Sequence, residues 1–362
     1  MKAVRTICGE YREEDIFNMD QTGLYWRRAP TTGLLTEAVP GVKKDKSRIS
    51  LMLCTNCTGS EKLPIWFIGK AKVPRPLKNV NIAALGGVWR SNSKAWCNTF
   101  IMQEWLLAFY QYISPSRLVL LLLDNFSAHS SALRLAPPPS HIRVQWLPAN
   151  ATSRFQPLDQ GIIQNFKVYY RKRWLQFMIQ QYNQGINPMD TMNIYYAVRW
   201  ALQAWIYEVT NPTIYACFRK SSIFDQPQIE LPIEPYPDLV GLYQQAQQAG
   251  RIREAMSLYQ FLNPEGEDRE PEVNSSLQLS DLIQRYIDEE VADEAIEEDE
   301  DINIPVPSHK EALAAVELLL RYQEHQAQTS EGDIRCLTKL ERVVATTIAA
   351  TQRQGTLDNW II

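Results

Sequence analysis

The segment RLVLLLLDN, residues 117–125, does more than any other to indicate the fold class. Its apolar run, Leu118 to Leu123, shows no alternation of apolar and polar residues. Such a run is typical of a strand that is buried on both faces in the centre of a sheet. The run ends at Asp124-Asn125, and open α/β sheets place their ligands at the carboxyl ends of such strands. The segment therefore predicts a central strand with an acidic residue at the functional edge of the sheet.

Further strands and helices are predicted on both sides of this segment. Before it come a short apolar approach to Asp20 that ends in a Thr22-Gly23 turn, an antiparallel hairpin and a helix; after it come a crossover, a strand and two helices. Their ranges are 16–19 for the approach, 48–54 and 63–68 for the hairpin, 99–113 for the first helix, 142–147 for the strand, and 159–182 and 193–207 for the last helices. This order predicts an α/β fold with a mixed sheet flanked by helices.

The character of the chain changes after Phe224. Four prolines interrupt residues 227–237, helical segments are expected near 239–262 and 277–291, and Glu289 to Asp301 form an acidic run typical of a solvated linker. A final pair of helices is expected beyond it. We therefore expect three regions: a sheet-containing domain over 1–225, a Pro-containing and acidic linker with short helices over 226–305, and a helical C-terminal region over 306–362. The last two form an acidic, mostly helical tail.

The overall net charge of −4 hides a division within the chain. Residues 1–224 carry 27 Lys and Arg against 13 Asp and Glu, a net of +14, whereas residues 225–362 carry 10 against 28, a net of −18. A basic front favours an anionic ligand there. The apolar content of 45% excludes wholesale disorder, and no apolar run approaches the roughly 20 residues of a membrane helix. The scattered cysteines favour reduced thiols, and the lone Cys54–Cys57 pair favours two structural residues over a zinc site.

Three aspartates stand at the predicted boundaries of strands or helices. Asp20 follows the first strand, Asp124 ends the central one and Asp159 begins the long helix. If the strands are neighbours, the carboxylates meet at one end of the sheet, where two of them about 4 Å apart would repel by roughly 4 kcal/mol. Mg²⁺ would remove that conflict, and two such ions form a known clamp for displacement at phosphorus. On spacing alone, however, three unrelated surface or capping aspartates remain an open alternative.

The sequence motifs around these aspartates resemble those of the DDE-type transposases of the pogo/Tigger group, to which centromere protein B and the jerky-like proteins are related. The motifs are NMDQTGLYW at 18–26, LLLDNFSAH at 121–129 and QPLDQGII at 156–163, with lesser matches at 64–71, 94–96 and 214–220. The similarity covers about residues 10–225. It implies an RNase H-like catalytic core.

The resemblance also implies roles for individual residues. Asp20, Asp124 and Asp159 would be the catalytic triad and would bind two ions of Mg²⁺ or Mn²⁺. Asn125 and His129 match the group's Asp-Asn-x-x-x-His word and would support the loop that carries Asp124. In such enzymes an activated water cuts the transposon end, and the released 3′-hydroxyl attacks target DNA.

Clusters of Lys and Arg lie just before the predicted hairpin and on the long helix. Phosphate neutralisation by such side chains gives DNA binding that does not depend on sequence. With the net charge of the front half, these clusters favour contact with the DNA backbone over a merely solvated surface. The residues predicted to bind DNA are Lys43, Lys44, Lys46 and Arg48 before the hairpin, and Arg171, Lys172 and Arg173 on the long helix.

The two ends of the chain carry further expectations. Complete members of the group have helix-turn-helix modules before the catalytic domain, and the residues before Asp20 are too few for one. At the other end, Gln354, Leu357, Trp360 and Ile361 resemble a peptide that binds the sliding clamp PCNA, with Trp-Ile in place of the usual aromatic pair. The residues alone favour the alternative, an amphipathic helix end that packs on the preceding helices.

The sequence thus predicts a metal-dependent DNA endonuclease and strand-transfer domain of a transposable element, located in the nucleus. Its partners would be DNA, a second copy of the chain by analogy with the group, and the clamp, with no membrane. The alternative is a domesticated DNA- or chromatin-binding protein that keeps the fold without transposition.

Overall fold

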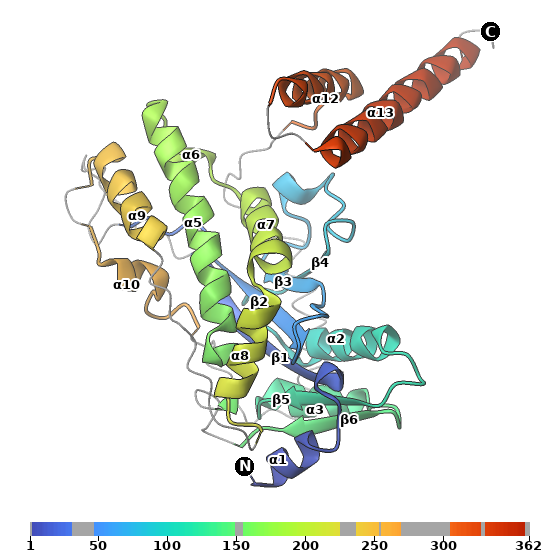
Figure 1. Cartoon of the computed structure of the whole chain (residues 1–362), viewed down its shortest axis with the longest axis vertical. Coiled ribbons are helices and arrows are strands. Elements are labelled where there is room, and N and C mark those ends of the chain that lie inside the picture. Colours follow the sequence, from blue (N-terminus) through green and yellow to red (C-terminus); the bar gives the residue numbers. More distant parts are fainter. Residues whose placement is uncertain are drawn as a thin grey trace. The chain divides into compact units, whose positions relative to one another are not determined.

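A computed structural model describes residues 2–30, 47–148, 155–224, 237–252, 255–268, 305–326 and 330–358. The described residues form one sheet in the order β4-β3-β2-β1-β5-β6 (Figure 1). Strands β1, β2 and β3 pair antiparallel, whereas β4 is parallel to β3, and β5 and β6 run parallel to β1. The strands are β1 (Ile16–Tyr25), β2 (Arg48–Asn56), β3 (Ile65–Gly69), β4 (Gly87–Ser91), β5 (Val119–Leu123) and β6 (Ile142–Trp146).

Helices cover both faces of this sheet (Figure 1). One face packs on α2 (Thr99–Tyr112) and α3 (Ser127–Leu135), and the other on a larger set that includes α5. That larger set comprises α5 (Ile162–Asn183), α7 (Ile194–Gln203) with the π-helical turn Ala204–Glu208, α8 (Asn211–Lys220), α9 (Pro237–Ala249) and α10 (Leu258–Leu262), beside the short α1 (Lys2–Cys8) and α6 (Pro188–Thr191). This mixed sheet between helices confirms the predicted fold class.

Strand β5 shows why its sequence has no polar alternation. Leu120 and Leu122 lie in the hydrophobic core on the α5 face, while Val119, Leu121 and Leu123 lie in the core on the α2 face. Successive side chains of a strand point to opposite faces, so a strand covered on both sides must be apolar throughout. The prediction of a strand buried on both faces is confirmed, although β5 lies between β1 and the edge strand β6 and not at the centre of the sheet.

Strand β1 is longer than the sequence predicts. It continues through Thr22-Gly23 to Tyr25, so Asp20 lies inside the strand and not after it. Gly23 is needed for a different reason than a turn: a Cβ built there would lie 1.9 Å from the carbonyl oxygen of Glu267. The backbone of a distant segment therefore packs directly on β1, a close approach that only glycine permits.

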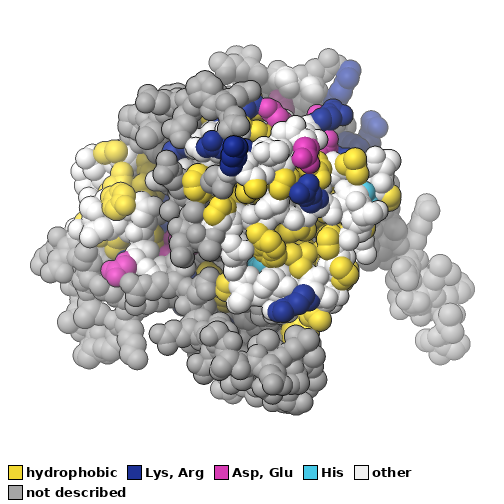
Figure 2. All heavy atoms as spheres, turned by 90° about the horizontal axis from the view of Figure 1, so that it is seen from below, with side chains coloured by type: hydrophobic (Ala, Val, Ile, Leu, Met, Phe, Trp, Pro, Cys, Tyr) yellow, Lys and Arg dark blue, Asp and Glu magenta, His cyan; other side chains and the backbone are white. Residues whose placement is uncertain are grey.

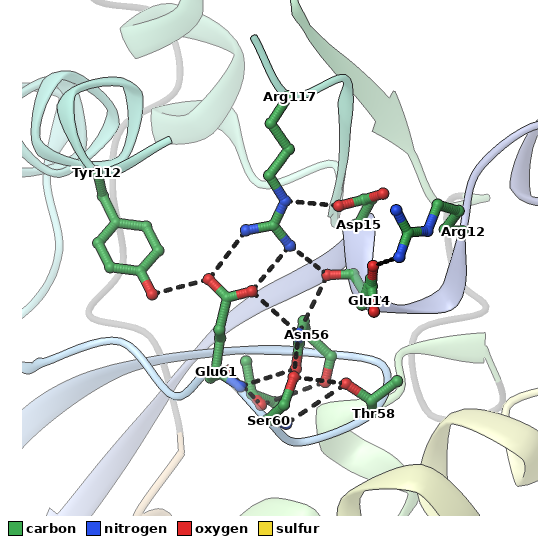
Figure 3. A network of polar contacts seen from close by, with 10 residues as sticks. Arg12, Glu14, Asp15, Asn56, Thr58, Ser60, Glu61, Tyr112 and Arg117 are labelled. Atoms are coloured by element: carbon green, nitrogen blue, oxygen red, sulfur yellow. Dashed lines mark hydrogen bonds and ion pairs between the residues drawn. The ribbon is translucent and has the colours of Figure 1, made fainter. Parts of the chain in front are cut away.

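At the opposite end of the sheet, Arg117 joins the starts of two strands to the β2–β3 connection (Figure 3). Its Nε donates to Asp15 at 2.5 Å, its NH2 group donates to the Glu14 carbonyl at 2.6 Å, and it pairs with Glu61 at 2.8 Å. Tyr112 also donates to Glu61. Because these partners favour the ion pair, the pKa of Arg117 is raised, chiefly by Glu61. The network fixes the N-terminal end of β1, which begins at Ile16.

The compact unit that contains the sheet does not end at residue 225, where the sequence analysis places a domain boundary. It extends from Met1 to Ile302. Leu239, Tyr243 and Ala246 of α9 and Phe261 of α10 are buried in the same hydrophobic core as α5. The prolines of residues 227–237 thus interrupt the chain without ending the domain. The predicted helix near 277–291 and the acidic run from Glu289 to Asp301 lie outside the described residues.

The second compact unit is residues 303–362, and it contains the predicted pair of helices, α12 (His309–Glu324) and α13 (Glu331–Asp358). A capping box formed by Ser308 and Glu311 starts α12. Gln354 and Leu357 fall in the last turns of α13, while Trp360 and Ile361 lie outside the described residues. The clamp-binding peptide stays a prediction. No helix among the described residues is long and apolar enough to cross a membrane.

The close approach at Gly23 is directly testable. We expect Gly23→Ala to lower the free energy of unfolding by about 1–3 kcal/mol, because the new methyl group must push Glu267 away from β1. Gly241→Ala in α9 is the matched control: nothing lies within 4 Å of its Cβ, so alanine should stabilise that helix by about 0.5–1 kcal/mol. Chemical denaturation measures both. Equal midpoints for Gly23→Ala and wild type would show that Glu267 does not pack there.

Candidate active site

The register of the sheet brings two of the three aspartates together. Ile16, Phe17 and Asn18 of β1 stand opposite Leu120, Leu121 and Leu122 of β5. The same register, continued by two residues, places Asp20 level with Asp124 just beyond the end of β5. Because side chains alternate along a strand, Asp20 lies on the same face as Asn18, the face covered by α5.

The third aspartate is held there by two buried amides. Asn18 donates through Nδ2 to the Leu122 carbonyl at 3.0 Å and to Gln156 Oε1 at 3.1 Å, and its Oδ1 accepts from the Leu158 amide at 3.0 Å. Gln156 in turn donates to the Met19 carbonyl at 3.2 Å. Both side chains are fully buried. They attach the short helix η3 (Leu158–Gln160), which contains Asp159, to strands β1 and β5.

The three carboxylates act on one another through their charges. Burial, followed by the charges of Asp159 and Asp124, raises the pKa of Asp20 well above its usual range. Burial and the neighbouring charges of Asp268 and Asp124 raise the pKa of Asp159 to about 6, although a hydrogen bond with Asp20 acts in the other direction. Two carboxylates that share a site cannot both ionise at their ordinary pKa. The three predicted carboxylates therefore lie close enough for their charges to act on one another.

Asp124 has a different partner. Its Oδ1 lies 2.6 Å from Nδ1 of His129, a fully buried residue of α3. Burial would raise the pKa of Asp124, but the contact with His129 outweighs it, and the pKa is lowered. Asn125 donates to the Leu147 carbonyl at 2.6 Å and so attaches the turn after β5 to the end of β6. Both residues contact the Asp124 turn, where the sequence analysis expects them to act.

The residues present suit a hard divalent cation by their chemistry. Asp20, Asp124 and Asp159 supply carboxylate oxygens, the ligands that Mg²⁺ prefers, and two of them have raised pKa values that a cation would relieve. Within the described ranges, however, no group of three or more His, Cys, Asp or Glu side chains is already arranged around a common metal position. The donor set fits the ion, whereas its side chains are not gathered on one point.

A second charged cluster, which sequence reasoning missed, adjoins the first. Lys167 of α5 lies 2.9 Å from both Glu267 and Asp268, and Arg171 pairs with Glu267 at 2.5 Å. Glu267 Oε1 also accepts from the Tyr25 amide at 2.6 Å. A signal was available: Lys167 and Arg171 are four residues apart on the buried face of the helix that carries Phe166, Tyr170 and Trp174. Cations on such a face require buried acidic partners.

This cluster corrects the assignment of Arg171 to a DNA-facing surface. Arg171 is fully buried, and its guanidinium donates to the Tyr25 carbonyl as well as to Glu267. Its neighbours are more accessible: the side chain of Lys172 is 34% exposed, and that of Arg173 is 29% exposed and paired with Glu208. Arg48, on β2, lies over the ring of Trp96. Lys43, Lys44 and Lys46 lie outside the described residues.

Comparisons with known proteins agree with the resemblance of the motifs. Residues 46–218 match the model of a family described as DDE superfamily endonuclease. CENP-B homolog protein 2 of Schizosaccharomyces pombe is 33% identical over 95% of this chain and 68% of its own length. Tigger transposable element-derived protein 4 of Mus musculus is 28% identical over 86% of the chain and 61% of its own length. The chain thus spans about two thirds of the length of these relatives.

Among solved structures, the Mos1 strand transfer complex matches 69% of this chain and 59% of its own, with 10% sequence identity and a TM-score of 0.34. The fold assignment rests on the strand order and pairing described above.

The raised pKa values predict how stability depends on pH. In EDTA, we expect the free energy of unfolding to fall as the pH rises from about 4 through 6, because the folded chain holds protons on Asp20 and Asp159 that the unfolded chain has released. Asp20→Asn should flatten this dependence and raise the melting temperature at pH 7 by about 2 °C or more.

Thermal unfolding between pH 4 and 8 measures the effect. Glu10→Gln is the control, since Glu10 is an exposed acid paired with Arg143 away from the cluster. A wild-type profile no steeper than that of Asp20→Asn would show that the carboxylates do not repel.

Proposed function

Because the chain belongs to the DDE superfamily endonucleases, the family that includes the CENP-B homologues and the Tigger transposable element-derived proteins, we propose that it is a metal-dependent DNA endonuclease and strand-transfer domain. The observation that carries the proposal is the charge coupling of Asp20, Asp124 and Asp159 at one edge of the sheet. Stability alone does not favour such a cluster, and perturbed carboxylates of this kind concentrate at functional sites.

The roles of the residues follow from their contacts. Asp20 and Asp159 would each give an oxygen to Mg²⁺ or Mn²⁺, and Asp124 would complete the set. When bound, a pair of such ions would supply the Lewis acidity that activates the attacking oxygen and stabilises the leaving oxygen at phosphorus. His129 is a positioning residue, because its contact at 2.6 Å keeps Asp124 ionised and ready to accept a cation. Asn125, bound to Leu147, would hold the same turn.

The substrate would be DNA held by its phosphates. Figure 2 shows one face of the chain on which Lys and Arg side chains lie among hydrophobic ones, with few acidic side chains in view. Elements in the lower part of Figure 1 carry exposed cations, such as Arg134 of α3. Lys172 and Arg173 of α5 offer further contacts. Such cations bind the backbone without reading its sequence.

The alternative function is DNA or chromatin binding without cleavage. It is favoured by the similarity to CENP-B homolog protein 2 over 95% of the chain and by the lack, in the described ranges, of a group of acids already arranged for a metal. Both functions would place the chain in the nucleus. Self-association and clamp binding remain predictions under either function.

Cleavage decides between the two functions. We expect the purified full chain to nick supercoiled DNA with Mg²⁺ or Mn²⁺, and Asp124→Asn to lose about 100-fold or more of that rate, since even an outer contact of a metal site is worth about 10- to 100-fold. Gel electrophoresis of the plasmid measures the rate.

Two controls separate metal loss from misfolding. Glu10→Gln, which alters an exposed acid, should cleave at the wild-type rate. Mn²⁺ should raise the melting temperature of wild type but not of Asp124→Asn. Binding of DNA by wild type with no cleavage at any metal concentration would rule out the endonuclease and favour the alternative.

A further inference from the structure

Three donors from two elements converge on the carboxylate of Asp268. Thr22 Oγ1 donates to its Oδ1 at 2.7 Å, the Gly23 amide donates at 2.9 Å, and Lys167 Nζ lies 3.0 and 2.9 Å from its two oxygens. We call this set of Thr22 Oγ1, Gly23 N and Lys167 Nζ the three-donor site. Its donors come from β1 and α5. The carboxylate that occupies it, Asp268, lies 245 residues after Gly23 in the chain.

The three donors are buried, whereas the side chain that occupies the site is exposed. Thr22 is 2% exposed and the Lys167 side chain 7%, so the donors are fixed in the interior. The side chain of Asp268 is 61% exposed and reaches the site from the solvent side. Glu267 next to it is 1% exposed and already anchors the segment through Arg171 and the Tyr25 amide. Anchoring therefore does not require Asp268.

The chemistry of the three-donor site is that of a phosphate-binding site. A backbone amide, a hydroxyl and an ammonium group around one anionic oxygen are the donors that proteins direct at phosphate oxygens. The site also lies beside the carboxylate cluster. Thr22 is two residues from Asp20 on the same strand face, about 7 Å along β1, and the charges of Lys167 and Asp268 both act on Asp159.

We propose that the three-donor site binds a backbone phosphate of DNA next to the position of cleavage, and that Asp268 occupies it in the DNA-free chain. The inference rests on the proposed function, since it names how that site would take its substrate. An arriving phosphate would displace the exposed carboxylate and take over its hydrogen bonds and its ion pair with Lys167. Departure of Asp268 would also remove one negative charge from the surroundings of Asp159.

Binding of a DNA duplex tests the proposal, measured by fluorescence anisotropy in Ca²⁺ at several salt concentrations with the full chain. We expect Asp268→Ala to bind about 2- to 5-fold more tightly than wild type, the range by which an exposed ion pair competes. The slope of log affinity against log salt should steepen by about 0.9, the value for one added phosphate contact. Adding Thr22→Val to Asp268→Ala should remove most of the gain.

Glu10→Gln changes the net charge by the same amount at a remote ion pair and is the matched control. An equal gain for Glu10→Gln and Asp268→Ala would overturn the proposal, since the effect would then be one of total charge. Weaker binding by Asp268→Ala would also overturn it and leave Asp268 as a structural contact only.

A second measurement does not depend on DNA binding or cleavage. Inorganic phosphate should raise the melting temperature of Asp268→Ala more than that of wild type or Glu10→Gln at the same ionic strength, because the emptied site can accept it. This result without any DNA binding would reject the proposed function but keep the three-donor site. No selective response to phosphate, together with no gain in DNA affinity, would overturn the inference itself.

Discussion

The side chain of Asn18 connects three segments that lie far apart in the chain. From its position in β1, it contacts the Leu122 carbonyl of β5, the Gln156 amide and the backbone of Leu158. All of its polar atoms are used, in a fully buried position where an unpaired amide would cost about 1–3 kcal/mol. The relative placement of the three aspartates depends on this side chain, since each of its partners lies within two residues of Asp20, Asp124 or Asp159 or bonds to one that does.

The fold brings negative charges together and compensates only some of them. On the buried side, Lys167 and Arg171 both form ion pairs with Glu267. Around Asp20 and Asp159 the charges remain unbalanced, and the pKa of both carboxyls is raised. Folding therefore works against repulsion at this one place. Proteins retain such local instability mostly where a ligand relieves it.

Patterns in the sequence predict the central elements well. The apolar run of β5 and the long face of α5 gave correct strands and helices because burial on both sides, or on one helical stripe, leaves a periodic trace. Strand β4 left none, because it is a short edge strand whose residues after Gly87 are only partly buried. The helix α3 between β5 and β6 was expected only as a crossover.

Some residues of the candidate site could likewise be predicted from the sequence, and others could not. Three distinctive motifs allowed Asp20, Asp124 and Asp159 to be predicted from the sequence. Glu267 and Asp268 were not, because they lie in a segment rich in acids where no spacing distinguishes a buried carboxylate from a solvated one. Arg171 was misjudged because a run of three basic residues resembles a surface, although only one of its members faces the core.

The contact between Gly23 and Glu267 also bears on how the chain folds. Beyond Asn18, the edge of β1 has no partner in β5, and the Gly23 amide donates to Asp268. Asp268 is synthesised some 245 residues after Gly23, so this amide has no partner until then. Long-range pairings of this kind slow folding, and exposed strand edges can pair with other chains in the meantime. Glu267 and Asp268 thus protect the edge of the first strand from aggregation once they have been made.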